Sequence, residues 1–340
     1  AAGMAPARAV WLDARGLQQG FKAHGGRGIG TYVAALAGAL DAVASPGRVG
    51  FVVERGAELL HPAPRARLVP APRALPGRGR LATQLHQHVQ LAAWLSTRRP
   101  AAVHFPAQTD PPALVGVRTI VTVHDVVLHR HGAWYATHAG DGLAARVSRV
   151  RFRTMRLLER LAIAHASRVI VPSRVTAREV EETLGVERAR MTVIPLAAAV
   201  RFTDVAAPSD ATVRARLRLP ERYLLHVGGA DARKRLPDVV AAFDALARGD
   251  AALGLVLAGP TGDAAGSEAL RRAIDVAAAR HRIVLTGPAS DADLPAVYRG
   301  ASALVLATRH EGFGLPVLEA FACGVPVVAT AADAVAEVAG

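Results

Sequence analysis

The stretch Glu311–Thr330, EGFGLPVLEAFACGVPVVAT, decides the fold class because a helix, a turn and a buried strand follow one another in it. Residues Pro316–Ala322 predict a helix that begins with proline at its first position, where the missing N–H costs nothing. The β-branched run Val325–Ala329 follows the turn at Cys323 and is typical of a buried parallel strand. A helix leading into such a strand indicates an α/β architecture.

Two glutamates flank the start of this predicted helix. Glu311 lies in the loop before the helix, and Glu319 lies about one turn inside it. Between them, Gly312 and Gly314 allow the backbone to turn tightly and to approach a ligand closely. A helix N-terminus also presents free N–H groups to an anion. The pattern therefore favours a site for the phosphates and hydroxyls of a sugar nucleotide, although a glutamate before a helix is often only a surface charge that complements the dipole.

Other apolar runs recur along the chain with helical segments between them, so we predict two Rossmann-like, doubly wound parallel sheets in an α/β fold. The predicted strands are Ala9–Leu12, Val49–Val53, Ala102–Phe105, Thr119–Val123, Arg168–Val171 and Met191–Ile194, then Tyr223–Val227, Gly254–Ala258, Arg282–Thr286, Ala303–Leu306 and Val325–Ala329. The segment Phe202–Asp210 separates the two series. We predict domains at 1–200 and 219–340 with a linker at 201–218, and a loop at His61–Arg80.

The composition is that of a globular protein large enough for two domains. The chain has 340 residues, of which 51% are hydrophobic. Its single cysteine, Cys323, excludes an intramolecular disulfide and fits a reducing compartment. No apolar run approaches the roughly 20 residues of a membrane span, and the first residues lack the core of a signal peptide. We therefore expect a cytoplasmic protein.

The basic charge is concentrated in the first part of the chain. Residues 1–200 carry 26 − 12 = +14 charges and residues 201–340 carry 15 − 16 = −1. This asymmetry indicates an anionic acceptor or peripheral contact with an anionic inner membrane surface, with a merely solvated basic face as the alternative. Nucleic acid is disfavoured because only 4% of residues are aromatic and no zinc-finger or RNP-like motif occurs. The candidate membrane contacts are Arg146, Arg149, Arg151, Arg153 and Arg156.

A second candidate phosphate-binding segment is YLLHVGGADARKRLPDVVAAF, which begins at Tyr223 and reads as strand, glycine turn, basic cluster and helix. Arg233 and Lys234 would follow the carboxyl end of the strand, where open α/β sheets bind their ligands. Two cations beside a helix start can clamp a diphosphate without a metal. The plainer interpretation is a surface pair at a helix start.

Two further stretches carry candidate residues. GGRGIGTY, which ends at Tyr32, lacks the spacing G-x-G-x-x-G and so argues against a dinucleotide fingerprint; Gly28 and Gly30 are its candidate ligand contacts, or else form a plain helix entry. In TVHDVV, His124 lies at the end of a predicted strand, and it is either a structural residue or a participant in the reaction. Asp125 would orient its imidazole or shape an acceptor pocket.

No metal site is predicted. Asp291 and Asp293 resemble a metal-binding D-x-D, but in PASDADLPAVY either Ser290 or Asp291 is predicted as a helix cap and Asp293 as a first-turn acid. Several histidines also lack the spacing of zinc ligands, namely His86, His88, His129 and His131.

The stretch E-G-F-G-L-P-V-L-E resembles the E-x7-E signature of retaining glycosyltransferases with the GT-B fold, specifically family 4 (glycosyl transferases group 1). The G-I-G-x-Y loop, the V-H-D segment and the G-x4-R-K segment follow the order of that family, and their style is closest to bacterial polysaccharide mannosyltransferases. The resemblance implies two domains facing a central cleft. Because the second domain of the family normally continues further, we expect this one to be incomplete at its C-terminus.

The resemblance also implies a role for each matching residue. The catalytic candidates are His124, which reaches the sugar, Arg233 and Lys234, which neutralise the leaving diphosphate, and Glu311, which contacts the donor sugar. The donor-binding candidates are Gly28, Gly30, Gly312, Phe313, Gly314, Leu315 and Glu319, of which Glu319 contacts the ribose. Gly229 departs from the family, because many relatives carry another phosphate-binding arginine at that position.

The implied reaction is the transfer of a hexose, with mannose favoured, from a GDP- or UDP-linked donor to a hydroxyl of a glycan or lipid-linked acceptor, with retention and without metal or cofactor. Two alternatives belong to other classes. One is a non-catalytic nucleotide-sugar-binding protein, and the other is a two-domain NAD(P)-dependent oxidoreductase. The missing G-x-G-x-x-G counts against the latter.

Overall fold

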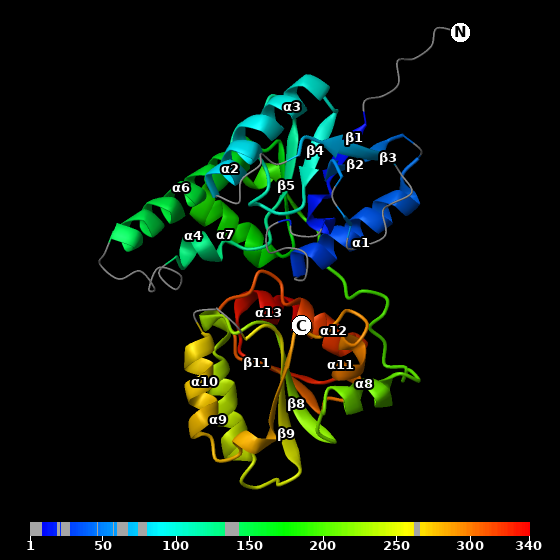
Figure 1. Cartoon of the computed structure of the whole chain (residues 1–340), viewed down its shortest axis with the longest axis vertical. Coiled ribbons are helices and arrows are strands. Elements are labelled where there is room, and N and C mark those ends of the chain that lie inside the picture. Colours follow the sequence, from blue (N-terminus) through cyan, green and yellow to red (C-terminus); the bar gives the residue numbers. More distant parts are fainter. Residues whose placement is uncertain are drawn as a thin grey trace. The chain divides into compact units, whose positions relative to one another are not determined.

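The computed structural model of the chain describes residues 9–18, 21, 28–45, 47–56, 58–59, 67–73, 80–132, 143–261 and 266–340. These residues form two compact units, each built on its own parallel sheet (Figure 1). The first unit takes the described residues of 1–126, 146–172 and 176–194, and the second takes those of 127–145, 173–175 and 195–340. The predicted two-domain α/β fold is confirmed.

The first unit contains a seven-stranded sheet in the order β3-β2-β1-β4-β5-β6-β7, with all neighbours parallel. Its strands are β1 Val10–Asp13, β2 Val49–Glu54, β3 Arg67–Ala71, β4 Ala102–Phe105, β5 Thr119–Thr122, β6 Arg168–Val171 and β7 Met191–Val193. The helices along this part of the chain are α1 Gly28–Val43, α2 Arg80–Leu85, α3 Leu91–Arg98, α4 Val127–Arg130, α6 Leu143–His165 and α7 Arg174–Leu184.

Both faces of this sheet are covered, as its apolar strands require. On one face, Leu12 of β1 and Phe51 of β2 pack with Val33 of α1. On the other face, Phe105 of β4 packs with Leu91 of α3. The doubly wound arrangement therefore follows from strands that are apolar on both sides.

The second unit contains a five-stranded parallel sheet in the order β10-β9-β8-β11-β12. Its strands are β8 Arg222–Val227, β9 Leu253–Ala258, β10 Ile283–Gly287, β11 Ala303–Leu306 and β12 Val327–Ala329. Its helices are α8 Asp210–Arg216, α9 Leu236–Leu246, α10 Ser267–Val276, α11 Leu294–Arg299, α12 Leu315–Ala322 and α13 Asp333–Ala339. In Figure 1, α9 and α10 lie on one side of the sheet and α11 and α12 on the other, which matches the two core clusters of this unit.

One strand lies where the sequence predicted a loop. Within His61–Arg80, the described residues Arg67–Ala71 form β3 at the edge of the first sheet. The Pro- and Arg-rich composition indicated a loop, and the proline within β3, Pro70, cannot donate to a ladder. An edge strand tolerates this residue, and Val69 is buried in the core. The prediction of a loop was therefore wrong for Arg67–Ala71. A correct prediction needed the strand order, which shows that this segment lies at the edge of the sheet.

The segment predicted as a linker at 201–218 contains helix α8. Val213 of α8 is buried, and Asp210 at its first position accepts hydrogen bonds from Arg299 of α11 at 2.6 and 2.7 Å. This helix therefore packs into the second unit.

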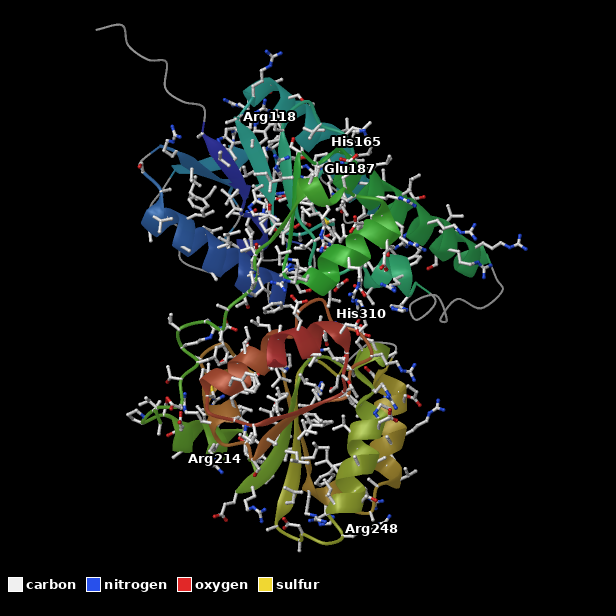
Figure 2. The ribbon with its side chains drawn as sticks, turned by 180° about the vertical axis from the view of Figure 1, so that it is seen from behind. Arg118, His165, Glu187, Arg214, Arg248 and His310 are labelled. Atoms are coloured by element: carbon white, nitrogen blue, oxygen red, sulfur yellow. The ribbon has the colours of Figure 1, made fainter. Side chains whose placement is uncertain are left out.

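The strand orders place a topological switch point in each sheet. The chain reverses its direction of travel between β1 and β4 in the first sheet, and between β8 and β11 in the second. Open α/β sheets bind ligands beyond the carboxyl ends of the strands at such points. Figure 2 shows His310, which follows β11, at the opposite end of the second unit from Arg248, which follows α9. The loops after β8 and β11 therefore lie where a ligand is expected.

Candidate donor-binding site

The loops that follow β8 and β11 bring three charged side chains together. The Nη1 atom of Arg233 lies 2.8 Å from Oε2 of Glu311, and Nζ of Lys234 lies 3.8 Å from Oε1 of the same carboxylate. The side chains are 16%, 12% and 15% exposed for Arg233, Lys234 and Glu311. We name these three residues the charged cluster. It joins two predicted motifs that are far apart in the sequence.

Backbone contacts hold the two loops of the charged cluster in place. Arg233 donates from Nη1 to the carbonyl oxygen of His310 at 2.7 Å, and the N–H of Arg309 donates to the carbonyl oxygen of Arg233 at 2.8 Å. The carboxylate of Asp231 accepts from the N–H of Arg233 at 3.0 Å and so caps the 3-10 turn Ala232–Lys234. The cations are therefore ordered by the protein itself before any ligand arrives.

The electrostatics of the cluster favour an ionised Glu311. Burial opposes its ionisation, but the neighbouring Lys234 and Arg233 outweigh burial and hold the pKa of this carboxyl below its usual range. Two cations share this one carboxylate, so an added anion would meet a favourable field.

A buried histidine lies close to the cluster. His226, in β8, places Nδ1 at 3.0 Å from the carbonyl oxygen of Val305. Burial, and then the charge of Lys234, lowers the pKa of His226 to about 3, so the ring is neutral near pH 7. Because a carbonyl only accepts, Nδ1 carries the proton. The sequence offered no signal for this residue beyond its place in a strand.

Gly228 makes room for Lys234. A Cβ atom at this position would lie 2.2 Å from Nζ of Lys234, and the residue has φ of +139°, a conformation that L side chains rarely adopt. The backbone conformation therefore requires glycine in the turn predicted after β8, and the absent side chain leaves room for the ammonium group of Lys234.

The start of α12 presents its backbone next to Glu311. Gly314 is the N-cap and has φ of +97°, so its glycine is required by the backbone. Gly312, Phe313 and Gly314 are all buried, while Leu315 is half-buried. The aromatic ring of Phe313 therefore belongs to the interior, and only its backbone could serve a ligand.

Glu319 lies in a different environment from Glu311. It is buried in α12, and its Oε2 accepts a hydrogen bond from the hydroxyl of Tyr298 in α11 at 2.7 Å. Burial is the largest influence and raises the pKa of Glu319 to about 7, although the bond from Tyr298 lowers it. Sequence reasoning missed Tyr298, because nothing in the pattern indicates that its hydroxyl meets Glu319.

His124 lies in the first unit, two residues after β5. Its Nε2 lies 2.8 Å from the carbonyl oxygen of Pro106 and therefore carries a proton, and its ring packs edge-on against Tyr32 of α1 with centroids 4.9 Å apart. Gln108 accepts from the N–H of His124 at 3.2 Å and donates to the carbonyl oxygen of Asp125 at 3.0 Å. The imidazole is thus oriented by a backbone carbonyl, and Gln108 holds the loop that carries it.

The candidate glycines of the stretch GGRGIGTY, Gly28 and Gly30, lie at the start of α1. Gly28 is exposed, and a Cβ atom there would meet nothing within 4 Å, whereas Gly30 is buried. Packing does not demand glycine at position 28, so close approach of a ligand remains the prediction for it. Residues 22–27 of this loop lie outside the described residues.

The aspartates of the D-x-D stretch are paired with arginines. Oδ2 of Asp291 lies 3.2 Å from Arg201, and Oδ1 of Asp293 lies 2.5 Å from Arg216. Ser290 bonds Asp293 through both its hydroxyl and its backbone, as a turn at the start of α11 requires. Among the residues described in the structure, no group of three or more His, Cys, Asp or Glu could hold a metal ion.

A further charged group lies at the carboxyl end of β1 and was missed in the sequence. Arg15 donates from Nε and Nη2 to the two carboxylate oxygens of Asp13, at 2.8 Å each, and its guanidinium also donates to the carbonyl oxygen of Asp110. The ring of Phe21 stacks under the guanidinium at 4.8 Å. Two opposite charges directly after a buried strand were a usable signal for this pair.

Two family models match the chain. The model described as Glycosyltransferase Family 4 matches residues 26–198, which is half of the chain, and the model described as Glycosyl transferases group 1 matches residues 211–340. Together they cover the two units in turn.

Similar proteins include a D-inositol 3-phosphate glycosyltransferase of Salinispora tropica, 34% identical over 187 residues, which is 51% of this chain and 38% of that protein. The chain therefore spans well under half the length of this curated relative. Among solved structures, sucrose-phosphate synthase from Thermosynechococcus elongatus has a TM-score of 0.67 at 22% identity, over 96% of this chain and 82% of that one.

HepE of Anabaena, solved in complex with UDP-glucose, has a TM-score of 0.65 at 17% identity, over 97% of this chain and 82% of that one. At these identities the structural likeness shows the fold alone, which is the GT-B arrangement of two Rossmann-like domains predicted from the sequence. The match of the family model over half of the chain shows more. The chain belongs to Glycosyltransferase Family 4.

Proposed function

We propose that the protein transfers a hexose from a nucleotide sugar to a hydroxyl with retention of configuration, without a metal or cofactor. The observation that carries the proposal is the charged cluster, in which Arg233 and Lys234 meet Glu311 at the switch point of the second sheet. The N-terminus of α12 adds backbone N–H groups beside the same carboxylate.

In this proposal Arg233 and Lys234 stabilise the diphosphate as it leaves. Its negative charge grows as the glycosidic C–O bond breaks, so cations held in place beforehand lower the barrier more than they strengthen substrate binding. Glu311 keeps both cations ordered in the absence of donor, and its carboxylate then accepts hydrogen bonds from the sugar hydroxyls.

Retention follows if the acceptor attacks from the side on which the diphosphate departs. The acceptor oxygen forms the new bond to the anomeric carbon, the bond to the phosphate oxygen breaks, and the departing phosphate takes the proton of the acceptor hydroxyl. No enzymic nucleophile is needed in this scheme. His124, whose Nε2–H is tied to Pro106, contacts the sugar in this scheme, which requires no base from it.

Donor and acceptor belong to the proposal as well. UDP-glucose is bound by HepE, and the curated relatives act on an inositol phosphate. For this chain a UDP- or GDP-linked hexose is proposed, with mannose favoured by the motif style, and a glycan or lipid-linked acceptor is proposed with it.

An anionic membrane surface is proposed as a further partner of the first unit. Helix α6 carries exposed apolar side chains at helical spacing, among them Val150 at 62% and Leu157 at 56% exposure. Arg146, Arg149, Arg151 and Arg153 are exposed on the same helix, whereas Arg156 is half-buried and stacks on Phe152. In the part of the chain that the structure describes, no helix is long and apolar enough to cross a membrane.

The decisive experiment combines product and stereochemistry. The protein is incubated with a panel of UDP- and GDP-hexoses and hydroxyl acceptors, and the released nucleoside diphosphate and the anomeric configuration of the product are measured with and without EDTA. Transfer with retention that persists in EDTA is expected. Binding without any release of diphosphate would favour the non-catalytic alternative, and strict dependence on a divalent cation would return attention to Asp291 and Asp293.

A further inference from the structure

We propose that Tyr298 is a positioning residue of the donor site, which fixes one carboxylate oxygen of Glu319 and so sets the pH below which recognition of the ribose is lost. The inference rests on the proposed function, in which Glu319 accepts hydrogen bonds from the ribose hydroxyls. It adds a residue that touches no substrate and a pH response that the family motifs do not state.

Two contacts hold the side chain of Tyr298, one through its ring and one through its hydroxyl. Its ring packs edge-on against Phe202, with centroids 5.6 Å apart and planes at 85°, and its side chain is fully buried. Its hydroxyl donates to Oε2 of Glu319 at 2.7 Å. Because both Tyr298 and Glu319 are buried, this bond is sheltered from competing water and holds the carboxylate in one orientation.

The chemistry of the carboxylate explains why this bond matters for binding. An ionised carboxylate offers about four lone-pair positions, so one bond from Tyr298 leaves room to accept from two ribose hydroxyls. A protonated carboxyl group loses acceptor capacity and adds a donor. The ribose and Tyr298 therefore both favour the ionised form of Glu319.

Other charged groups also act on this carboxylate. Arg201, from the chain segment before α8, favours the ionised form of Glu319, and Asp291, from the loop before α11, opposes it. These two are themselves paired at 3.2 Å, which limits the net effect of either. Cys323, at the end of α12, also interacts electrostatically with Glu319. Burial raises the pKa of this thiol and keeps it neutral. Tyr298 is thus the foremost influence that favours ionisation, ahead of Arg201.

The direction of the pH effect follows from these influences. The pKa of Glu319 is raised to about 7, so the ligand-binding ionised form predominates above this pH and is lost as pH falls through it. Removing the hydroxyl of Tyr298 removes an interaction that favours the ionised form. The loss of ribose recognition should then begin at a higher pH.

The test measures the affinity of UDP relative to 2′,3′-dideoxy-UDP, and of GDP relative to 2′,3′-dideoxy-GDP, between about pH 5.5 and about pH 8.5 by calorimetry. The ratio within each pair cancels the protonation of the terminal phosphate, whose pKa of about 6 would otherwise dominate the profile. In the unaltered protein, the preference for the ribonucleotide should fall by up to about tenfold per pH unit below the midpoint. In Tyr298→Phe the midpoint should rise by about one unit, as expected for the loss of one hydrogen bond.

Tyr223→Phe is the matched control. The hydroxyl of Tyr223 is equally buried and donates to the carbonyl oxygen of Val297 at 2.8 Å, with no carboxylate as partner. Both variants lose one buried hydroxyl and should lose similar thermal stability, but only Tyr298→Phe should move the midpoint. Glu319→Gln, which cannot ionise, should show a small ribose preference that does not change with pH.

The outcomes separate the inference from the proposed function. Equal midpoints in the unaltered protein, Tyr298→Phe and Tyr223→Phe, together with a clear ribose preference, would overturn the role of Tyr298 and leave the ribose contact intact. A pH-dependent preference that survives in Glu319→Gln would also overturn the role of Tyr298. If the unaltered protein shows no ribose preference at any pH, the assignment of Glu319 in the proposed function fails, and the inference fails with it.

Discussion

Each sheet has an ion pair at its switch point, and the two pairs differ in how they are enclosed. At the carboxyl end of β1, Arg15 and Asp13 are 1% and 2% exposed, and the guanidinium donates to both carboxylate oxygens of its partner. Beyond β8 and β11, the charged cluster is 12–16% exposed, and two cations share one carboxylate. The topology is the same, but one pair is sealed and the other is open.

The comparison separates a structural ion pair from a binding one. Burial opposes the charge of Arg15, yet Asp13, together with two more distant carboxylates, outweighs burial and raises the pKa of the guanidinium, so Arg15 and Asp13 serve mainly to compensate one another. At the charged cluster, the three side chains are partly exposed, and the two positive charges of Arg233 and Lys234 exceed the one negative charge of Glu311. A sealed pair should therefore affect stability, and an open one should affect the reaction.

The largest effect should come from breaking the sealed pair. Arg15→Met leaves Asp13 buried without compensation and should lower the free energy of unfolding by about 3–5 kcal/mol. Urea unfolding followed by circular dichroism measures this. Adding Asp13→Leu to Arg15→Met should recover most of the loss, because both charges are then absent. If Arg15→Met alone were as stable as the unaltered protein, the pair would not be structural.

A substitution in the charged cluster should lower the turnover of the enzyme. Lys234→Ala should lower kcat by about 10²–10³, as the removal of a preorganised donor does, and should change KM much less. Release of nucleoside diphosphate is the assay. Arg235→Ala is the neighbouring control, since this more exposed arginine pairs with Asp238 in the first turn of α9. Equal losses in both variants would assign the effect to general charge and not to the clamp.

Within the second unit, Glu311 is partly exposed and Glu319 is buried, so the two glutamates extend the comparison. Glu319→Ala should weaken the binding of the nucleoside diphosphate by about 1.5–3 kcal/mol, the range for hydrogen bonds to a charged group. Calorimetric titration of a folded variant measures this loss. Unchanged affinity would remove Glu319 from the donor site, while leaving the charged cluster in place.

The smallest effect should come from the exposed arginines of α6. Arg149→Gln and Arg153→Gln should each weaken binding to anionic vesicles by about 1 kcal/mol at low salt, and salt near 1 M should abolish most of the binding because the Debye length falls to about 3 Å. Co-sedimentation with anionic and neutral vesicles is the measurement. Arg188→Gln serves as the control because this exposed arginine already pairs with Glu181. Equal recovery with both kinds of vesicle would leave α6 as a solvated basic face.

Much of the local structure could be predicted from the sequence. The apolar runs identified β4, β6 and β11 at their observed bounds, because a strand buried on both faces needs a continuous apolar run. The segment EGFGLP predicted the helix start at α12, because proline and glycine restrict the backbone locally. These features depend on residues that are neighbours in the sequence.

The tertiary structure decided which of these local features meet. Between Arg233 and Glu311 the chain passes through α9, β9, α10, β10, α11 and β11, and the two residues pair only because β8 and β11 are adjacent in the sheet. Tyr298 meets Glu319 because α11 and α12 pack on the same face. Pro70 fits in a strand only because β3 lies at the edge. The sequence by itself determined the elements and the residue types at their ends, whereas strand order and helix packing, which depend on contacts between distant residues, determined the partners of each charge.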